Sequence, residues 1–354
     1  MDTLKLLKQL SEISGPAGYE HAVADALTHL WQPLADEVRT DAMGNVIALQ
    51  YATGASNGEV NQRLMLAAHM DEIGLIVTGL EGEFLRIHTL GGTDRRVLLG
   101  LEVDVHGREV LPGVIGARPP HVLPAAERNR IPPWHELFVD VGLPAERVRE
   151  LVRVGDYVTP RAPLRTLKND RAAGKALDNR ASVAAVTLAL AELRRRQHAW
   201  DIYAVATIQE EVGTKGATTS AYGIAPALAV ALDVTFATQH DDSAPGTFAL
   251  GSGPTIGVGP NFHPEIVSRL KQAAEAEEIP YVIEPLPGSS GTDAWAIQLA
   301  REGIPTGLIS IPLRYMHQPV ELVDRKDIER AARLLARFAS DLEADFRPHW
   351  EDEL

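Results

Sequence analysis

Apolar residues near the N-terminus recur at helical spacing, with leucine or isoleucine at every third position from Leu4 to Ile13. This spacing predicts an amphipathic helix, which the glycine- and proline-containing residues 14–18 terminate. The pattern then predicts a helix over residues 20–34, a strand over residues 46–50, a polar loop over residues 54–61 and a strand over residues 63–68. Two helices followed by two apolar strands open a layered α/β domain.

Residues 74–164 have a different pattern, in which short β-rich runs alternate with Gly, Pro and Asp turns and no long helical repeat occurs. The predicted strands cover residues 75–78, 84–89, 103–105, 110–115, 137–141 and 157–160. Residues 118–133 carry five prolines, which predicts a long exposed loop and a candidate contact with another subunit. We therefore predict an inserted all-β domain over residues 74–164.

After residue 169 the alternation of helices and strands returns. The predicted helices cover residues 178–197, 216–223, 264–278, 293–303 and 325–346, and the predicted strands cover residues 202–208, 228–232, 255–258, 281–283 and 306–311. The α/β domain is therefore split in sequence into residues 1–73 and 165–354.

Composition narrows the classes of function. The 354 residues are 45% hydrophobic and carry a formal net charge of -14, which argues against nucleic acid or an anionic membrane as the main partner. The chain has no cysteine, so nitrogen and oxygen atoms must hold any metal. The N-terminal residues do not resemble a signal peptide, and the apolar stretch 181–193 is too short to span a bilayer. We therefore expect a soluble, cytoplasmic protein.

Two adjacent acids, Glu210 and Glu211, follow the apolar run 202–208. Such a run predicts a buried strand that ends at the carboxyl edge of a sheet, where α/β proteins place their chemistry. Because side chains alternate along a strand, we expect the two acids to point in different directions. Paired like charges at this place need a positive partner. Lys215 is near in sequence, but a divalent metal neutralises two acids better than one lysine does.

Several other polar residues near the ends of predicted β elements have both a structural and a functional interpretation. His69 and Asp71 form either a surface turn or a metal ligand whose ring is oriented by a carboxylate. Asp178 either caps a helix or bridges two cations. Asp233 closes the predicted strand before it, and His317 lies in a loop after a strand. Each is either a metal ligand or a residue with a local structural role.

Taken together, these residues supply enough nitrogen and oxygen ligands for two divalent cations, with one carboxylate shared. Glu210 is left over beside a ligand, where it could take a proton from a metal-bound water. The ligand set consists of His69, Asp178, Glu211, Asp233 and His317.

The chain resembles the dinuclear-metal aminopeptidases that assemble as tetrahedral dodecamers, called TET or glutamyl/deblocking aminopeptidases, some members of which are labelled cellulase or endoglucanase M. The matching runs are AHMDEIG (68–74), KALDNR (175–180), QEEVG (209–213), GTDA (291–294) and RYMHQPVE (314–321), with RVLLG (96–100) and RPPH (118–121) in the insert. They extend over nearly the whole chain and keep their order.

The resemblance implies an α/β fold, a phosphorylase/hydrolase-like three-layer α/β/α catalytic domain with an inserted β-barrel-like dimerisation domain. It implies that His69 and Asp233 complete one metal site, that Glu211 and His317 complete the other, and that Asp178 bridges them. Two divalent ions per subunit, zinc or cobalt, and a homo-oligomer, a dodecamer built from dimers, are further implications.

The resemblance also gives Asp71 the role of orienting His69 and Glu210 that of general base. We therefore expect an aminopeptidase that hydrolyses the N-terminal residue from peptides with free N-termini, through a metal-bridging water activated by Glu210. A loop of small residues would let a peptide backbone approach closely, and we expect it to line the substrate cleft. The loop residues are Gly288, Ser289, Ser290, Gly291 and Thr292.

Two other functions account for part of the pattern. A glycoside hydrolase also uses two carboxylates, but it leaves the remaining ligand-type residues unexplained, and only 5% of the residues are aromatic. A metal-stabilised assembly or peptide-binding module without catalysis leaves Glu210 without a purpose. The preferred N-terminal residue, whether acidic, neutral or basic, and the native metal stay open at this point.

Overall fold

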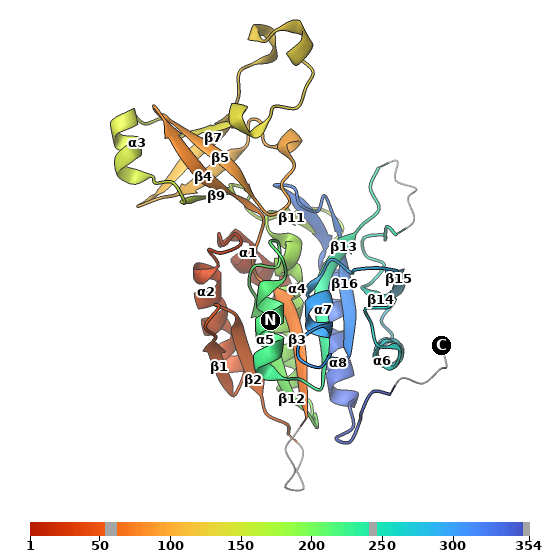
Figure 1. Cartoon of the computed structure of the whole chain (residues 1–354). Helices are drawn as coiled ribbons and strands as arrows, with labels where there is room; N and C mark the ends of the chain where they lie inside the picture. The colour runs from red at the N-terminus through yellow and green to blue at the C-terminus, as the bar shows by residue number, and fades with distance from the viewer. Residues whose placement is uncertain (54–61, 241–245, 350–354) are drawn as a thin grey trace.

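The computed structural model describes residues 1–53, 62–240 and 246–349. These residues form a large α/β part and a smaller β-barrel that stands on one end of it (Figure 1). The polar loop predicted over residues 54–61 lies outside the described residues.

The α/β part is built on a sheet of 11 strands within the described residues. The main path across it is β1 (Glu37–Thr40), β2 (Val46–Gln50), β12 (Asp201–Thr207), β3 (Arg63–His69), β13 (Leu228–Phe236), β16 (Thr306–Arg314), β17 (Glu321–Asp324), β11 (Arg171–Gly174) and β10 (Arg165–Thr166). β14 (Thr255–Val258) pairs with β16, and β15 (Val282–Pro285) pairs with β14. The four central strands β12, β3, β13 and β16 are parallel to one another, so their carboxyl ends share one edge.

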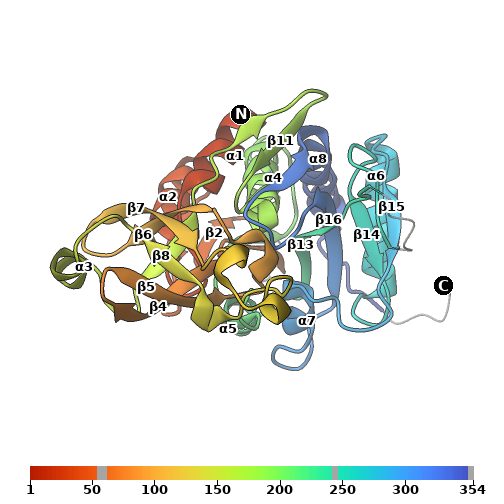
Figure 2. The ribbon, with the colours of Figure 1, turned by 90° about the horizontal axis from the view of Figure 1, so that it is seen from above.

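Helices cover both faces of this sheet, as the view from above shows (Figure 2). One face carries α1 (Thr3–Glu12), α2 (His21–Trp31), α4 (Leu177–Leu193), α6 (Pro264–Ala276) and α8 (Arg325–Asp341), and the other carries α5 (Lys215–Ile224) and α7 (Asp293–Gln298). Parallel strands that are buried on both faces read as continuous apolar runs. This explains why β3, β12 and β13 are detectable in the sequence.

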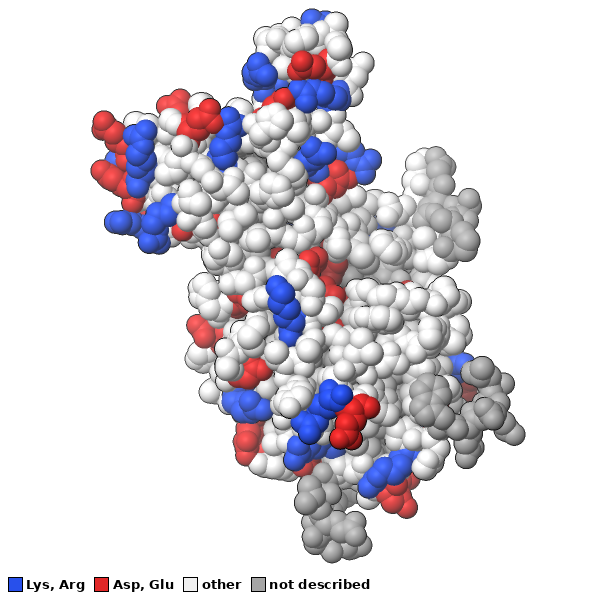
Figure 3. Space-filling model, in the orientation of Figure 1, with Lys and Arg blue, Asp and Glu red and all other residues white. Residues whose placement is uncertain are grey.

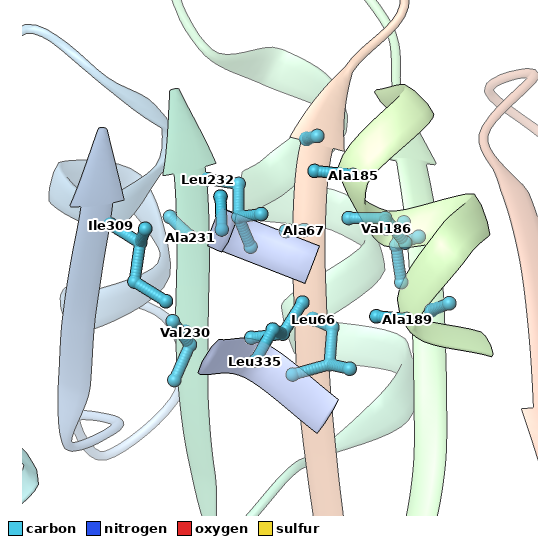
Figure 4. Close-up of a cluster of buried hydrophobic side chains, with 14 of the residues drawn as sticks. Leu66, Ala67, Ala185, Val186, Ala189, Val230, Ala231, Leu232, Ile309 and Leu335 are labelled. Atoms are coloured by element: carbon cyan, nitrogen blue, oxygen red, sulfur yellow. The ribbon is translucent and has the colours of Figure 1, made fainter. Parts of the chain in front are cut away.

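The centre of the α/β part is packed with small and branched side chains (Figure 4). Helix α4 packs against the sheet beside α8, which also contacts β16 and β17, and nearly all residues of α4 are buried. Its Ala185, Val186 and Ala189 face the sheet beside Leu66 of β3 (Figure 4). Alanines allow the helix to approach the strands closely. Helix α4 begins at Leu177, so Asp178 lies in its first turn, close to His69 at the end of β3.

The barrel is a closed ring of antiparallel strands with an apolar core of its own. Its order is β4 (Gly74–Glu81), β5 (Phe84–Leu90), β8 (Phe138–Asp140), β7 (Val110–Gly116), β6 (Glu102–His106) and β9 (Tyr157–Pro160). Closure leaves the ring without an unpaired strand edge. The predicted fold class, a layered α/β domain with a barrel-like insert, is confirmed.

Within the insert, one short helix, α3 (Ala145–Leu151), is not predicted by the sequence pattern. It spans only two turns and buries Val148 alone, so it carries almost no apolar periodicity. Residues 118–133 contain the single-turn 3-10 helices η3 (Pro120–Val122) and η4 (Ala125–Glu127), and no strand occurs in this fully described segment.

Several predicted boundaries in the α/β part are wrong. β13 continues to Phe236 because its pairing with β16 extends beyond Asp233, so Asp233 lies inside the strand instead of closing it. Helix α7 ends at Gln298 instead of residue 303, because the chain turns there and Arg301 takes a positive φ of 56°. The short strands β1, β10, β11 and β17 have mixed polar patterns that no strand periodicity reveals. β1 and β10 pair with the next strand along the chain, whereas β11 and β17 pair with each other across a long separation in sequence.

Candidate metal centre

The predicted ligands converge at the carboxyl edge of the central strands. β3 ends at His69, which stands in register with Thr207 at the end of β12. Asp233 of β13 pairs with Ser310 of β16. Because parallel strands deliver their carboxyl ends to the same edge, residues far apart in sequence meet at this place.

Two groups of side chains at this edge could each hold a metal ion, and they share one carboxylate. In the first group, His69 Nε2 lies 3.1 Å from Asp178 Oδ1 and 3.7 Å from Asp233 Oδ1. In the second, His317 Nε2 lies 3.4 Å from Asp178 Oδ2 and 3.5 Å from Glu211 Oε2. The structure thus brings all five sequence-predicted ligand residues together, with Asp178 between the two histidines.

These distances fit shared ions. Two ligand atoms at about 2.1 Å from one tetrahedral ion lie roughly 3.4 Å apart, which is the spacing seen in both groups. Glu211 Oε1 is buried and has no hydrogen-bond partner within the described residues. Nitrogen and carboxylate oxygen donors suit zinc, cobalt and similar divalent ions. The residues therefore fit a pair of divalent cations.

The charges in the site also call for cations. Burial, and then the charge of Asp178, raises the pKa of Glu211 well above its usual value. Asp233 behaves in the same way: burial, reinforced by Asp178, raises its pKa. Burial lowers the pKa of His69, but contacts with Asp178 and Asp71 outweigh burial and leave this pKa raised. The protein alone does not neutralise this cluster of carboxylates, whereas divalent ions would.

Asp71 contacts the backbone of Glu210 and Glu211, the two acids that follow β12. Its two carboxylate oxygens accept hydrogen bonds from the backbone N–H groups of Glu210 and Glu211, at 3.0 and 3.1 Å. The distance from its Oδ1 to His69 Nδ1 is 3.5 Å, which is longer than a good hydrogen bond. The hydrogen bonds that Asp71 accepts therefore chiefly fix the turn that carries Glu210 and Glu211.

Glu210 lies beside the two groups but belongs to neither. Glu210 and Glu211 lie in a turn and not in the strand, because β12 ends at Thr207 and Gln209 has a positive φ of 53°, so strand alternation does not set their directions. Burial raises the pKa of Glu210 to about 8, and the positive charge of His69 only partly offsets this. The side chain of Glu210 lines the same cavity as the ligands.

Glu321 is a buried carboxylate that the sequence analysis did not single out. Its Oε2 accepts the backbone N–H of Asp178 at 2.9 Å, and its Oε1 accepts the backbone N–H of His317 at 3.1 Å. Glu321 therefore fixes Asp178, which the two groups share, and holds His317 in its positive-φ conformation. The available signal was an acid four residues after a candidate ligand, at the start of the short strand β17.

The barrel reaches the site through two glycines that follow β5. A Cβ atom added at Gly92 would lie 2.7 Å from His317 Nδ1, and one added at Gly91 would lie 3.3 Å from Glu211 Oε2. Gly91 also has a positive φ of 78°. Glycine suits this close approach, because the positive φ of Gly91 disfavours other residues and a side chain at Gly92 would displace the His317 ring. The paired glycines after a predicted strand were the available signal.

A cavity of about 350 Å³ opens beside the ligands. On the face drawn in Figure 3, acidic side chains gather where the barrel meets the α/β part. Three residues of the predicted loop, Ser290, Gly291 and Thr292, line the cavity, whereas Gly288 and Ser289 are not among its described lining residues. Thr292 also caps α7 by accepting the backbone N–H of Ala294.

Comparison with known proteins places this fold and site in a family. The family model described as M42 glutamyl aminopeptidase matches residues 44–334. A lysyl aminopeptidase from Pyrococcus furiosus is 35% identical over 351 residues, with 97% of this chain and 99% of that protein covered.

Solved structures agree. An aminopeptidase from the archaeon Desulfurococcus kamchatkensis is 37% identical with a TM-score of 0.88, and the match covers 97% of this chain and 96% of that one. The TET1 peptidase of Pyrococcus horikoshii, described as assembling into a tetrahedron or a large octahedral shell, is 31% identical with a TM-score of 0.84, over 96% of this chain and 100% of that one.

The mixed sheet with its parallel centre, the closed barrel and the two groups that could each hold a metal ion fit the class of metal-dependent hydrolases. This chain belongs to the M42 family of aminopeptidases, and it is a hydrolase that acts as an exopeptidase. Among the helices in the described ranges, none combines the length and apolarity needed to cross a bilayer.

Proposed function

We propose that this enzyme removes the N-terminal residue from peptides with free N-termini, with two divalent metal ions and Glu210 as general base. The observation that supports this most strongly is the sharing of Asp178 between two ligand groups, with Glu210 beside both in one cavity. The glycoside hydrolase alternative is not favoured, because the carboxylates are grouped with histidines at metal-ligand spacing.

The ligands divide between the two ions in this proposal. His69 and Asp233 would complete one site, Glu211 and His317 would complete the other, and Asp178 would bridge them. Zinc or cobalt suits this donor set. When bound, the ions would lower the pKa of a water molecule and polarise the carbonyl of the first peptide bond.

The residues of this chain then move protons and position groups. The carboxylate of Glu210 takes a proton from the attacking water and later gives it to the leaving amine. Asp71 holds the backbone of Glu210 and Glu211, and Glu321 holds Asp178 and His317. The acid-rich cavity favours the positive α-amino group of a substrate, which accounts for exopeptidase activity.

We also propose that the loop over residues 288–292 contacts the backbone of the bound peptide. Ser290, Gly291 and Thr292 line the cavity, and Gly288 and Ser289 adjoin them. Gly291 has a positive φ of 66° and nothing within 4 Å of the position of a Cβ atom. The absence of a side chain at this point leaves room for a peptide backbone.

Assembly is the third element of the proposal. Residues 74–164 would form a dimerisation domain, and dimers would build a dodecamer. A solved relative with 30% identity and a TM-score of 0.83 is described as a dodecamer, and this chain exposes Leu99, Val110, Val122 and Ile131 on its insert. Exposed apolar side chains on one domain are typical of subunit contacts. The cytoplasmic location expected from the sequence stays a prediction.

The test begins with chelator-treated protein reloaded with zinc or cobalt. It would be offered a panel of aminoacyl-p-nitroanilides covering acidic, neutral and basic residues, beside peptides whose amino termini are free or acetylated. The proposal predicts that metal restores hydrolysis and that only free amino termini are cleaved. Protein that demonstrably contains metal but cleaves no substrate, or that cleaves acetylated peptides equally well, would contradict it.

A further inference from the structure

One wall of the cavity contains a buried carboxylate that the proposed mechanism does not use. Glu284 of β15 is 8% exposed and lines the cavity. The hydroxyl of Thr235 donates to its Oε1 and the hydroxyl of Thr255 donates to its Oε2, each at 2.5 Å. Three neighbouring elements, β13, β14 and β15, thus fix this carboxylate in one orientation.

No cation within the described residues pairs with Glu284: none of the ion pairs found there involves it. Two neutral hydroxyl groups orient a carboxylate but do not neutralise it, and they leave further acceptor positions on its two oxygens. A buried carboxylate without a positive partner is costly. The arrangement is therefore suited to a cation that enters from the cavity.

The position of Glu284 relates it to the metal groups. Asp233 and Thr235 are two residues apart on β13, so their side chains leave the same face of that strand, roughly 7 Å apart along it. Thr235, which donates to Glu284, is therefore the next residue on the same face of β13 after the predicted metal ligand Asp233. A substrate residue whose backbone lies at the metals would extend its side chain toward Glu284.

Apolar side chains share the cavity with Glu284 and the ligand groups. The cavity is also lined by Val234, Phe236, Leu286, Leu308 and Met316. Such walls suit the aliphatic part of a long side chain whose charged end reaches a carboxylate. An acidic side chain would be repelled by Glu284, and a purely aliphatic one would remove water from Glu284 without supplying a partner.

We infer that Glu284 is the specificity-determining residue of this site and that it selects a basic N-terminal residue, lysine or arginine. This inference rests on the proposed aminopeptidase function and adds the class of side chain that the cavity accepts. Glu284 contacts the substrate side chain and takes no part in proton transfer.

The test compares lysyl with norleucyl p-nitroanilide, because norleucine has the same aliphatic chain without the ammonium group. The metal-loaded wild type should show kcat/KM higher for lysine by roughly tenfold or more. In Glu284→Gln, whose amide can still pair with both threonine hydroxyls, the lysine-to-norleucine ratio should fall to about 1, because the preference for the ammonium group depends on the carboxylate. The same change at the exposed Glu302 should leave the ratio unchanged.

The outcomes separate this inference from the function on which it rests. Wild-type enzyme that cleaves norleucine or glutamate as well as lysine overturns the inference while the aminopeptidase function stands, and this readout needs no variant to fold. A Glu284→Gln enzyme that loses lysine and norleucine activity equally also overturns it, because Glu284 would then act on a shared feature such as the α-amino group. Metal-loaded enzyme that cleaves no substrate at all contradicts the proposed function itself.

Discussion

The α/β part and the barrel both bury apolar strands, but they do so in different ways. The central strands of the sheet are parallel and buried on both faces, with helices over them. The barrel strands are antiparallel and close on themselves around a core that is separate from that of the sheet. All five candidate metal ligands come from the α/β part, and the barrel approaches them through backbone at Gly91 and Gly92. One part carries the chemistry, and the other limits the space around it.

If this division is correct, a defect in the barrel core should destabilise the protein without changing its metal groups. Leu137 is fully buried in the barrel. Leu137→Ala should cost about 2–5 kcal/mol of unfolding free energy, because it removes buried methyl groups and leaves a cavity. Denaturant unfolding measures the cost, and metal analysis of the folded fraction should still show two ions per chain, as the proposed ligand sets require. Loss of metal from folded protein would contradict the separation of roles.

Within the α/β part, Glu321→Gln should have the next largest effect. The carboxylate of Glu321 accepts hydrogen bonds from the backbone N–H groups of both Asp178 and His317. In the glutamine variant, the NH2 group would face one of these N–H groups, and that hydrogen bond would be lost. Partners that orient metal ligands typically contribute about 10- to 100-fold in metal affinity, and titration calorimetry of the metal-free protein measures the change. Glu146→Gln, an exposed substitution on the barrel helix α3, is the matched control. Equal affinities in both variants would exclude this role for Glu321.

At the contact between the two parts, Gly92→Ala should have a smaller and more selective effect. The new Cβ atom would press on the ring of His317, which is partly exposed and can move aside. We expect affinity for one of the two ions to fall about tenfold, with unfolding free energy changed by less than about 1 kcal/mol. Gly79→Ala in β4, where the new Cβ atom would meet Arg86 at an ordinary contact distance of 3.7 Å, serves as control. Two ions bound as tightly as in the wild type would show that the barrel does not constrain the site.

The contrast between the two parts also explains what the sequence could predict. The strands β3 and β12 are continuous apolar runs, so the positions of His69 and Glu211 at their carboxyl ends followed from the local pattern. Glu321, Gly92 and Glu284 act through contacts between segments distant in the chain, such as the pairing of β14 with β15 and β16. No local periodicity encodes those contacts. For the same reason the extension of β13 past Asp233 depends on β16 and was missed.

The central claim is that Glu210 moves protons while its neighbour Glu211 holds metal, and one pair of variants tests it most directly. Metal content and kcat would be measured together for Glu210→Gln and Glu211→Gln. Glu210→Gln should keep both ions and lose about 10²- to 10⁴-fold in kcat, as expected for removal of a general base. Glu211→Gln should lose affinity for one ion, because an amide oxygen is a weaker ligand than a carboxylate. A Glu210→Gln enzyme that has wild-type kcat, or that loses metal as Glu211→Gln does, would contradict the account.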